Sequence, residues 1–423
     1  MPVSNELTPS HLPLEVSMPE PQEELYIDML YTEEPGQSES ASIINHSDEG
    51  IVFTAGTSSK LILHGKGSKE DAVHGKICNP LSKPKREIRV VTISPQSSTS
   101  DFDISCAFTV VSLDTNPTYK ALSYTWGDPQ DTLPILVNGH RVNVTRNLKR
   151  ALQRLRSLDT PTPIWIDAIC INQVDMDERM HQVQLMRDIY EKPDEVVVYL
   201  GEPYSINEVL KYARAYADTY PDLPDGRPEN HLVLAMCLMR LLAGDVHLEE
   251  IPLLGNVNIQ RACIAAFQGL ILQPWWNRIW VVQEVILPPK VTVIFGSFTA
   301  PLSMYASAST HLSKHRSTCC SAVLPSSDPQ NACLDDYCHK MQTIVESGRL
   351  WRENADTTLM TLLRLYYPKD ATDARDKIYG LLGLVRDWGN DGPITPDYTV
   401  SGTTLYQKVA LHSISVTRSL EFL

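Results

Sequence analysis

The residue types best suited to chemistry lie close together between positions 275 and 285. Three of the seven tryptophans, Trp275, Trp276 and Trp280, occupy six positions there, and Glu284 follows four residues after the last of them. Residues four apart share a face of a helix, so a helix over 275–285 would place Glu284 beside an indole in partly apolar surroundings. Desolvation raises the pKa of a carboxyl group and suits it to catalysis. The alternative is a core helix whose glutamate simply reaches solvent.

Alternating strand and helix patterns around this segment predict the elements that would position Glu284. A short strand runs into a glycine-containing loop over residues 119–128, and apolar runs of strand length cover residues 164–171, 195–200 and 291–295. Helical patterns separate these runs, as in an open parallel sheet with crossover helices. We therefore predict an α/β fold.

Two β-hairpins are predicted outside this parallel sheet. Residues 87–93 and 104–112 alternate between apolar and polar types and are rich in β-branched side chains. Residues 134–144 turn at Asn138-Gly139, a strong signal for a two-residue hairpin loop. After this second hairpin, Thr145 can cap a helix, and further along Asp175 or Asp177 can open another.

Composition divides the chain into three predicted parts. Residues 1–85 are acidic and rich in Ser and Pro, and we expect them to be mostly disordered. Residues 86–300 form the predicted α/β domain, with a helical insertion at about 205–270. Residues 301–423 are predicted to be a helical C-terminal extension.

The net charge belongs to the N-terminal part and argues against nucleic acid as a partner. Residues 1–50 hold eleven acidic residues and no lysine or arginine. Removing these eleven charges from the net charge of −14 leaves −3 for the rest of the chain. A body without net positive charge is not expected to bind phosphates by counterion release.

The cysteines and the hydropathy pattern favour the cytoplasm, with the nucleus as the alternative. Nine cysteines are scattered without a paired rhythm, and the first twenty residues are not an apolar signal peptide. Reduced thiols are typical of intracellular proteins. No run of roughly eighteen apolar residues predicts a membrane span.

The carboxyl ends of the predicted strands offer a place for a ligand. In open parallel sheets ligands bind beyond these ends, and three predicted loops lie there: 125–128, 172–173 and 201–202. An aromatic platform with a few convergent polar groups is the usual composition of a small-molecule site. We predict such a pocket from Trp126, Asp128, Asn172 and Glu284, the alternative being that these are ordinary turn residues.

Asp167 interrupts the apolar run at 164–171, where an ionised carboxylate needs a partner. Arg179 or Arg278 could supply the positive charge. A structural ion pair is the favoured interpretation of Asp167, with catalysis as the alternative.

The sequence does not predict a metal site, although ligand types are present. Seven residues of the ligand types that zinc prefers lie within about thirty positions, namely His311, His315, Cys319, Cys320, Cys333, Cys338 and His339. They include no Cys-x-x-Cys pair, and the adjacent Cys319-Cys320 fits a tetrahedral site poorly.

Two other enzyme classes find no support in the sequence. Cys170 and His181 have nothing that would orient one toward the other, so a cysteine hydrolase is not expected. There is neither a Walker loop nor a Gly-x-Gly-x-x-Gly motif for nucleotide phosphates.

Three blocks carry a family resemblance. They are Tyr119-Lys-Ala-Leu-Ser-Tyr-Thr-Trp-Gly-Asp128, then Ile164-Trp-Ile-Asp-Ala-Ile-Cys-Ile-Asn-Gln173 with Glu178-Arg179, then Trp276-Asn-Arg-Ile-Trp-Val-Val-Gln-Glu284. In this order they closely resemble the blocks of the fungal heterokaryon-incompatibility (HET) domain. Asp373-Ala-Arg-Asp-Lys-Ile-Tyr-Gly-Leu-Leu-Gly383 and Pro396-Asp-Tyr398 are similar to the segment that follows the domain in many such proteins. Relatives often continue beyond it, so a short form and a truncated gene model are both alternatives for a sequence ending at Leu423.

The HET domain is in turn distantly similar to TIR domains, which implies a TIR-like, flavodoxin-like parallel sheet. Trp280-Val-Val-Gln-Glu-Val285 is similar to the TIR pattern Trp-Cys-x-x-Glu-Leu, with Val281 at the cysteine position. In TIR enzymes this glutamate is needed to cleave NAD, and the match places it at Glu284. The resemblance implies NAD as a substrate rather than a bound cofactor. It would be held by Ser123, Trp126, Gly127, Asp128 and Asn172.

The resemblance implies a signalling or cell-death effector of fungal non-self recognition. In one version Glu284 cleaves the nicotinamide–ribose bond of NAD. In the alternative the domain is a non-enzymatic adaptor that acts by self-association and recruitment. Either version implies a homo-oligomer on activation and an incompatibility partner protein whose identity the sequence does not give.

Overall fold

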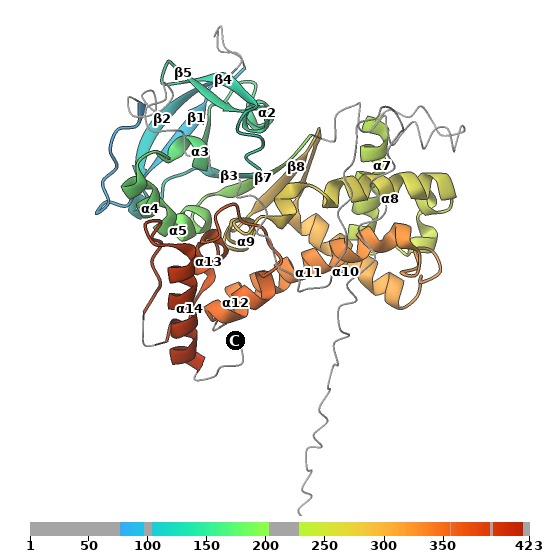
Figure 1. Cartoon of the computed structure of the whole chain (residues 1–423). Helices are drawn as coiled ribbons and strands as arrows, with labels where there is room; N and C mark the ends of the chain where they lie inside the picture. Colours follow the sequence, from blue (N-terminus) through green and yellow to red (C-terminus); the bar gives the residue numbers. More distant parts are fainter. Residues whose placement is uncertain (1–76, 97–103, 203–227, 356, 390–391, 418–423) are drawn as a thin grey trace, which may run out of the picture. The chain divides into compact units, whose positions relative to one another are not determined.

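The computed structural model describes residues 77–96, 104–202, 228–355, 357–389 and 392–417 (Figure 1). All of them belong to one compact unit that covers residues 60–423. Most of the segment predicted to be disordered, 1–85, lies outside the described residues. Its end is described, and Ile77 there is buried in the hydrophobic core.

The described residues contain a nine-stranded mixed sheet in the order β5-β4-β2-β1-β6-β3-β7-β8-β9. Its strands are β1 (Glu87–Ile93), β2 (Ser105–Ser112), β3 (Lys120–Tyr124), β4 (Thr132–Val137), β5 (His140–Thr145), β6 (Thr162–Trp165), β7 (Glu195–Gly201), β8 (Val291–Phe295) and β9 (Phe298–Pro301). The central strands β6, β3, β7 and β8 are parallel. Counted along the chain they have the order 2-1-3-4, which is the flavodoxin-like arrangement. The predicted α/β class with parallel strands at its centre is confirmed.

Both predicted hairpins are present and extend the parallel strands on one side. β1 pairs with β2 and β4 with β5, each antiparallel. Asn138 and Gly139 have φ angles of 50° and 77°, the left-handed values that a type I′ turn requires. On the other side β9 pairs antiparallel with β8 and was not predicted, because its four residues are too few for a clear alternation.

Helices cover the sheet and form a separate group beyond β8 and β9 (Figure 1). The α-helices are α2 (Arg146–Leu155), α3 (Asp167–Cys170), α4 (Met176–Gln184), α5 (Met186–Glu191), α7 (Pro228–Ala243), α8 (Val257–Ile271), α9 (Val281–Ile286), α10 (Leu302–Ser317), α11 (Ala332–Arg352), α12 (Leu359–Tyr366), α13 (Asp376–Tyr379) and α14 (Gly402–Thr417). The 3-10 helices are η1 (Leu113–Thr115), η2 (Leu248–Glu250), η3 (Pro252–Leu254), η4 (Pro274–Asn277), η5 (Pro329–Asn331) and η6 (Leu382–Leu384). Among the helices of the described part of the chain, none has the length and apolar character to cross a bilayer.

The predicted helix starts are confirmed at two caps. The Thr145 side chain accepts a hydrogen bond from the N–H of Leu148 at the start of α2. The Asp175 side chain accepts from the N–H groups of Asp177 and Glu178 at the start of α4. Both caps satisfy amide groups that the first helical turn leaves without a partner.

The predicted strand over 164–171 is wrong in its second half. β6 ends at Trp165, and α3 begins at Asp167. The N–H of Cys170 donates to the carbonyl of Ile166 over 2.7 Å, which closes a helical turn. A short, fully apolar run does not distinguish a buried strand from a buried helix.

The predicted continuous helix over 275–285 is also wrong. The segment contains η4 and α9, separated by residues 278–280, of which Arg278 has extended φ and ψ angles of −71° and 136°. Here the chain pairs with a distant segment: the N–H of Ile279 donates to the carbonyl of Asp370 over 2.9 Å. This pairing removes amide groups that a continuous helix would use.

Candidate functional site

Glu284 lies at the carboxyl end of β3, joined to a serine and a tryptophan. The hydroxyl of Ser123 donates a hydrogen bond to Oε2 of Glu284. The indole Nε1 of Trp275 in turn donates to Oγ of Ser123 over 2.7 Å. All three side chains are buried, with Glu284 only 4% exposed. The indole connected to Glu284 is therefore that of Trp275, reached through Ser123.

Burial dominates the electrostatics of Glu284. It raises the pKa of this carboxyl group from 4.5 to about 7. The Arg278 guanidinium and the hydrogen bonds from Ser123 and Tyr190 act in the opposite direction, and the negative charge of Asp167 adds to the increase. A carboxyl group with a pKa near neutrality can exist in either protonation state at physiological pH.

Asp167 forms the second acidic part of the site, at the first position of α3. Its carboxylate accepts hydrogen bonds from Nε1 of Trp126 and from the N–H of Ala168, each over 2.7 Å. Burial raises its pKa, and the nearby Arg278 guanidinium is the main influence that lowers it. Of the two arginines that the sequence suggested as partners, Arg278 acts on Asp167.

Arg278 connects the two carboxylates to the sheet. Its Nη1 atom donates to the backbone carbonyl of Tyr124, the last residue of β3. Its charge favours the ionised form of both Asp167 and Glu284. Arg278, which interrupts the predicted helix, thus also supplies positive charge to Asp167 and Glu284.

The site lies where ligands bind in flavodoxin-like sheets. The strand order reverses beside β3, and the first residues beyond the carboxyl ends of β3 and β6 include Trp126 and Asp167. Ligands bind in the crevice at such a switch point. Trp126 is 42% exposed, so its ring face is available at this edge.

The other predicted ligand-binding residues do not converge on Glu284. Gly127 has a φ of 82°, a left-handed conformation that favours glycine. Asp128 accepts the N–H of Gln130 over 2.8 Å and so closes a turn. The backbone N–H of Asn172 donates to Glu178, whereas its Oδ1 atom is buried and has no hydrogen-bond partner within the described residues.

A buried ion pair lies behind this edge and was not foreseen from the sequence. Arg89 of β1 contacts both carboxylate oxygens of Glu178 of α4, over 2.5 and 2.8 Å. Arg89 also donates to the carbonyl of Cys170 at the end of α3. Arg89 therefore holds α3, which carries Asp167, and α4, which carries Glu178, against the sheet.

Two further residues, Tyr190 and Trp275, belong to the site and were not among the predicted site residues. Tyr190 is buried on α5, and its hydroxyl donates to the carbonyl of Leu122 over 3.3 Å. Trp275 packs edge-to-face on Trp276 with ring centroids 4.9 Å apart. Their neighbours in the sequence are mostly apolar, which indicates packing rather than function. Only the fold brings the polar atoms of Tyr190 and Trp275 to Glu284 and Ser123.

Comparison of the sequence with known proteins shows similarity to one family. Residues 119–284 match the family described as heterokaryon incompatibility protein (HET). The chain is 30% identical over 360 residues to heterokaryon incompatibility protein 6, OR allele, of Neurospora crassa. The alignment covers 77% of this chain and 51% of the relative, so the chain spans about half the length of that protein. No solved structure matches the chain significantly, and the likeness to TIR domains stays a prediction.

Proposed function

Because the chain belongs to the heterokaryon incompatibility family, we propose that it acts in fungal non-self recognition as a signalling domain leading to cell death. The family match begins at β3 and ends at Glu284. The two residues of the hydrogen bond between Ser123 and Glu284 therefore lie near the start and at the end of the matched range. The proposal therefore concerns the part of the chain that carries the candidate site.

The proposed reaction is hydrolysis of NAD at the nicotinamide–ribose bond. Water adds to the anomeric carbon while the bond from that carbon to the nicotinamide nitrogen breaks. The electron pair passes to the ring nitrogen, and a proton of the water passes to solvent. The products are nicotinamide and ADP-ribose, and the reaction needs neither an oxidant nor a further cofactor.

Each residue of the site has a proposed role in this reaction. Ionised Glu284 accepts hydrogen bonds from the ribose hydroxyls and stabilises the positive charge that develops at the anomeric carbon. The exposed ring of Trp126 stacks on the nicotinamide or the adenine. In this proposal Ser123, Gly127, Asp128 and Asn172 bind the rest of the substrate when the loop after β3 opens, and the buried Oδ1 atom of Asn172 then accepts a hydrogen bond from a hydroxyl group.

The observation that carries the proposal is a buried carboxyl group of raised pKa at the switch point of the sheet. The same burial means that the substrate must displace the Ser123 hydroxyl from Glu284. In this proposal the substrate also replaces the hydrogen bond between Trp126 and Asp167, which joins the loop after β3 to α3. We therefore propose that the enzyme forms only when self-association opens the loop after β3.

A second function is favoured by the low exposure of Glu284. A carboxylate that is 4% exposed and hydrogen-bonded to a buried serine suits a structural role. In this version the domain is an adaptor that self-associates and recruits a partner protein.

The deciding experiment compares the full chain with its Glu284→Gln variant. Both are incubated with NAD over rising protein concentrations, and nicotinamide release and particle mass are measured. Asp159→Asn, an exposed carboxylate outside the site, is the control. Release that rises with assembly and is lost only in Glu284→Gln supports the enzyme. Absence of release by the assembled wild type, together with cell killing by Glu284→Gln at normal protein levels, decides for the adaptor.

A further inference from the structure

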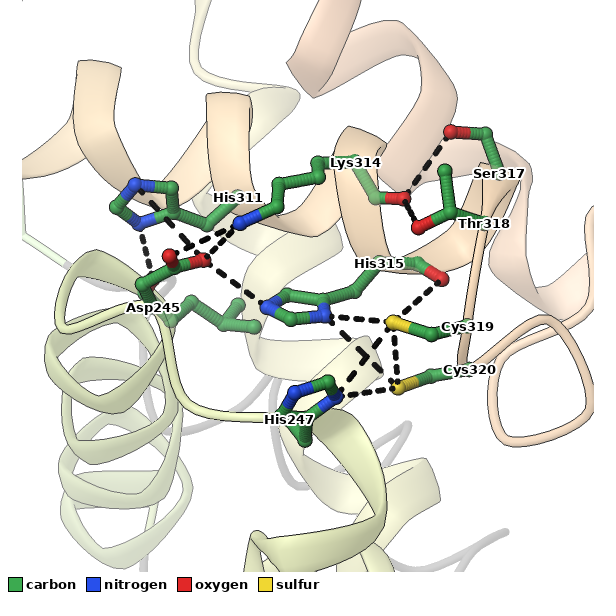
Figure 2. Close-up of polar contacts among 10 residues, drawn as sticks. Asp245, His247, His311, Lys314, His315, Ser317, Thr318, Cys319 and Cys320 are labelled. Atoms are coloured by element: carbon green, nitrogen blue, oxygen red, sulfur yellow. Dashed lines mark hydrogen bonds and ion pairs between the residues drawn. The ribbon is translucent and has the colours of Figure 1, made fainter.

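Two imidazoles and two thiols meet at the end of α10, in the helical group beyond the sheet (Figure 2). His315 lies in the last turn of α10, and Cys319 and Cys320 follow directly after its end. His247 comes from the segment between α7 and η2. One nitrogen or sulfur atom from each of the four residues lies within 4.8 Å of the others.

The sulfur–sulfur and sulfur–nitrogen distances in this group are close to those of a tetrahedral zinc site. Zinc bonds of about 2.3 Å to sulfur and 2.0–2.1 Å to nitrogen imply about 3.8 Å between two sulfurs and about 3.5 Å between sulfur and nitrogen. The Sγ atoms of Cys319 and Cys320 are 3.5 Å apart. Nδ1 of His315 lies 3.1 and 3.9 Å from these sulfurs, and Nδ1 of His247 lies 3.5 and 3.6 Å from them.

The adjacent cysteines fit because the helix ends between His315 and Cys320. The N–H of Cys319 and the N–H of Cys320 both donate to the carbonyl of His315, over 3.2 and 2.8 Å. This turn directs both thiols to the same side, toward the imidazoles (Figure 2). Their separation of 3.5 Å is well beyond the roughly 2.05 Å of a disulfide bond.

A carboxylate orients one of the imidazoles, as in many metal sites. Oδ1 of Asp245 accepts a hydrogen bond from Nε2 of His315 over 3.1 Å. This bond places the proton on Nε2 and leaves Nδ1 unprotonated toward the thiols. Ligating histidines almost always donate their second nitrogen in this way. Lys314 donates to both oxygens of Asp245 over 3.1 and 3.0 Å and holds the carboxylate in place.

The two thiols also differ in their readiness to lose a proton. The contact with His315 is the main cause that lowers the pKa of Cys319 to about 6. Burial raises the pKa of Cys320, and the Cys319 thiol adds to this increase. Zn²⁺ bound by two thiolates and two neutral imidazoles is uncharged overall, so the ion compensates the charge of both sulfurs.

We propose that His247, His315, Cys319 and Cys320 bind one structural Zn²⁺ ion, with Asp245 as the carboxylate that orients His315. Four protein ligands fill a tetrahedral shell, so this site has no open position for catalysis. The ion links the segment after α7 to the end of α10, two helices that pack on each other. It thereby stabilises the helical group independently of the site at Glu284.

A metal was not predicted from the sequence, because residues 311–339 hold no Cys-x-x-Cys pair and one of the four ligands lies outside this range. His311 instead contacts the carbonyl of Leu242 over 3.0 Å, and Cys338 donates to the carbonyl of Ser309. The ligand that completes the group, His247, is about seventy residues away in the chain. Only the packing of α7 on α10 brings it to the cysteines.

The test measures zinc binding by the full chain, purified under reducing conditions and stripped with a chelator. Titration against a chromophoric zinc indicator is expected to give one ion per chain. Cobalt substitution is expected to give the intense visible absorption of a tetrahedral thiolate site. Cys319→Ser and Cys320→Ser are expected to lose this site, and Asp245→Asn to bind about 10–100-fold more weakly. Cys237→Ser, an exposed cysteine of α7, is the matched control and retains wild-type affinity.

A measurement on the wild type alone covers the case in which the variants fail to fold. Zinc is expected to protect Cys319 and Cys320 from alkylation while leaving Cys237 reactive. Absence of stoichiometric zinc, or equal affinity in Cys319→Ser and Cys237→Ser, would overturn the proposal. A mass lower by two hydrogens in the peptide with Cys319 and Cys320, without zinc binding, would identify a disulfide between them and would also overturn the proposal.

Discussion

Two buried acidic side chains of this protein have pKa values shifted in opposite directions. Glu284 has a single nearby cation, Arg278, and burial outweighs it and raises the pKa of Glu284 to about 7. Glu195 is buried too, but hydrogen bonds from Lys120, Thr292 and Lys290 outweigh the desolvation and lower its pKa to about 2. Partners therefore decide the sign of the pKa shift, and burial alone does not.

The Glu284→Gln variant is expected to be more stable than the wild type at neutral and alkaline pH. A raised native pKa means that the folded state holds its proton more strongly, so wild-type stability falls as the pH rises from about 4.5 to about 7. With about 1.36 kcal/mol per pKa unit, the difference above pH 7 is on the order of 3 kcal/mol. Urea unfolding at a series of pH values measures it.

The Glu195→Gln variant provides the comparison of opposite sign. A lowered native pKa contributes stability above the unfolded value of 4.5, and this contribution is lost as the pH falls toward 2. Glu195→Gln is therefore expected to be less stable than the wild type at neutral pH, and the difference is expected to shrink in acid. If the stability difference from the wild type had the same pH dependence in both variants, the opposite pKa shifts assigned to Glu284 and Glu195 would be wrong.

The Arg89→Met variant is expected to lose about 3–5 kcal/mol of stability. Arg89 is 1% exposed, and its removal leaves the buried Glu178 carboxylate without its cation. Arg349→Met is the control, because Arg349 is 48% exposed and its pairs with Glu346 and Glu353 lie at the surface. Surface pairs contribute at most about 1 kcal/mol, so equal losses in urea unfolding would contradict a structural role for Arg89.

At the scale of the elements, the sequence correctly predicted those helices and turns that are determined by local interactions. The hairpin at Asn138-Gly139 and the helix starts at Thr145 and Asp175 depend on backbone preferences and on bonds to near neighbours. The break at Arg278 depends on Asp370, which lies about ninety residues away and left no signal in the helical pattern. Likewise, Glu284 was found as a candidate, but its contacts with Ser123 and Tyr190 required the fold.

Replacing Asp175 by alanine is expected to destabilise the protein by about 0.5–2 kcal/mol. The Asp175 carboxylate accepts two N–H groups at the start of α4, and alanine leaves both without that partner. Asp175→Asn keeps an acceptor oxygen and is expected to retain most of the stability. Thermal unfolding of the three proteins measures this. An alanine variant as stable as the asparagine variant would show that the cap contributes nothing.

At the scale of the whole molecule, the residues after 370 support the helix that carries Glu284. Nε2 of Gln283 donates to the carbonyl of Tyr379 over 3.3 Å, next to a cavity of about 360 Å³. The hydroxyl of Tyr398 donates to Asp376 over 2.6 Å, and the Arg179 guanidinium lies 4.4 Å from the centre of the Tyr398 ring. These contacts join α4, α9 and the C-terminal segments, so the environment of Glu284 depends on residues beyond the family match at 119–284.

The close approach at Gly380 gives a test of this dependence. A Cβ atom added at Gly380 would lie 2.9 Å from the carbonyl of Asp376 and 3.2 Å from the side chain of Ile279 just before α9. Gly380→Ala is therefore expected to push the segments apart, with a loss of about 1–3 kcal/mol typical of overpacking. Amide hydrogen exchange in α9, at Glu284 in particular, is expected to accelerate. At Gly402 the nearest atom to an added Cβ is 4.0 Å away, so Gly402→Ala is the matched control. Unchanged exchange in Gly380→Ala would mean that α9 is held by the sheet and by α5 and α11 alone, and Glu284 would then be positioned without the C-terminal segments.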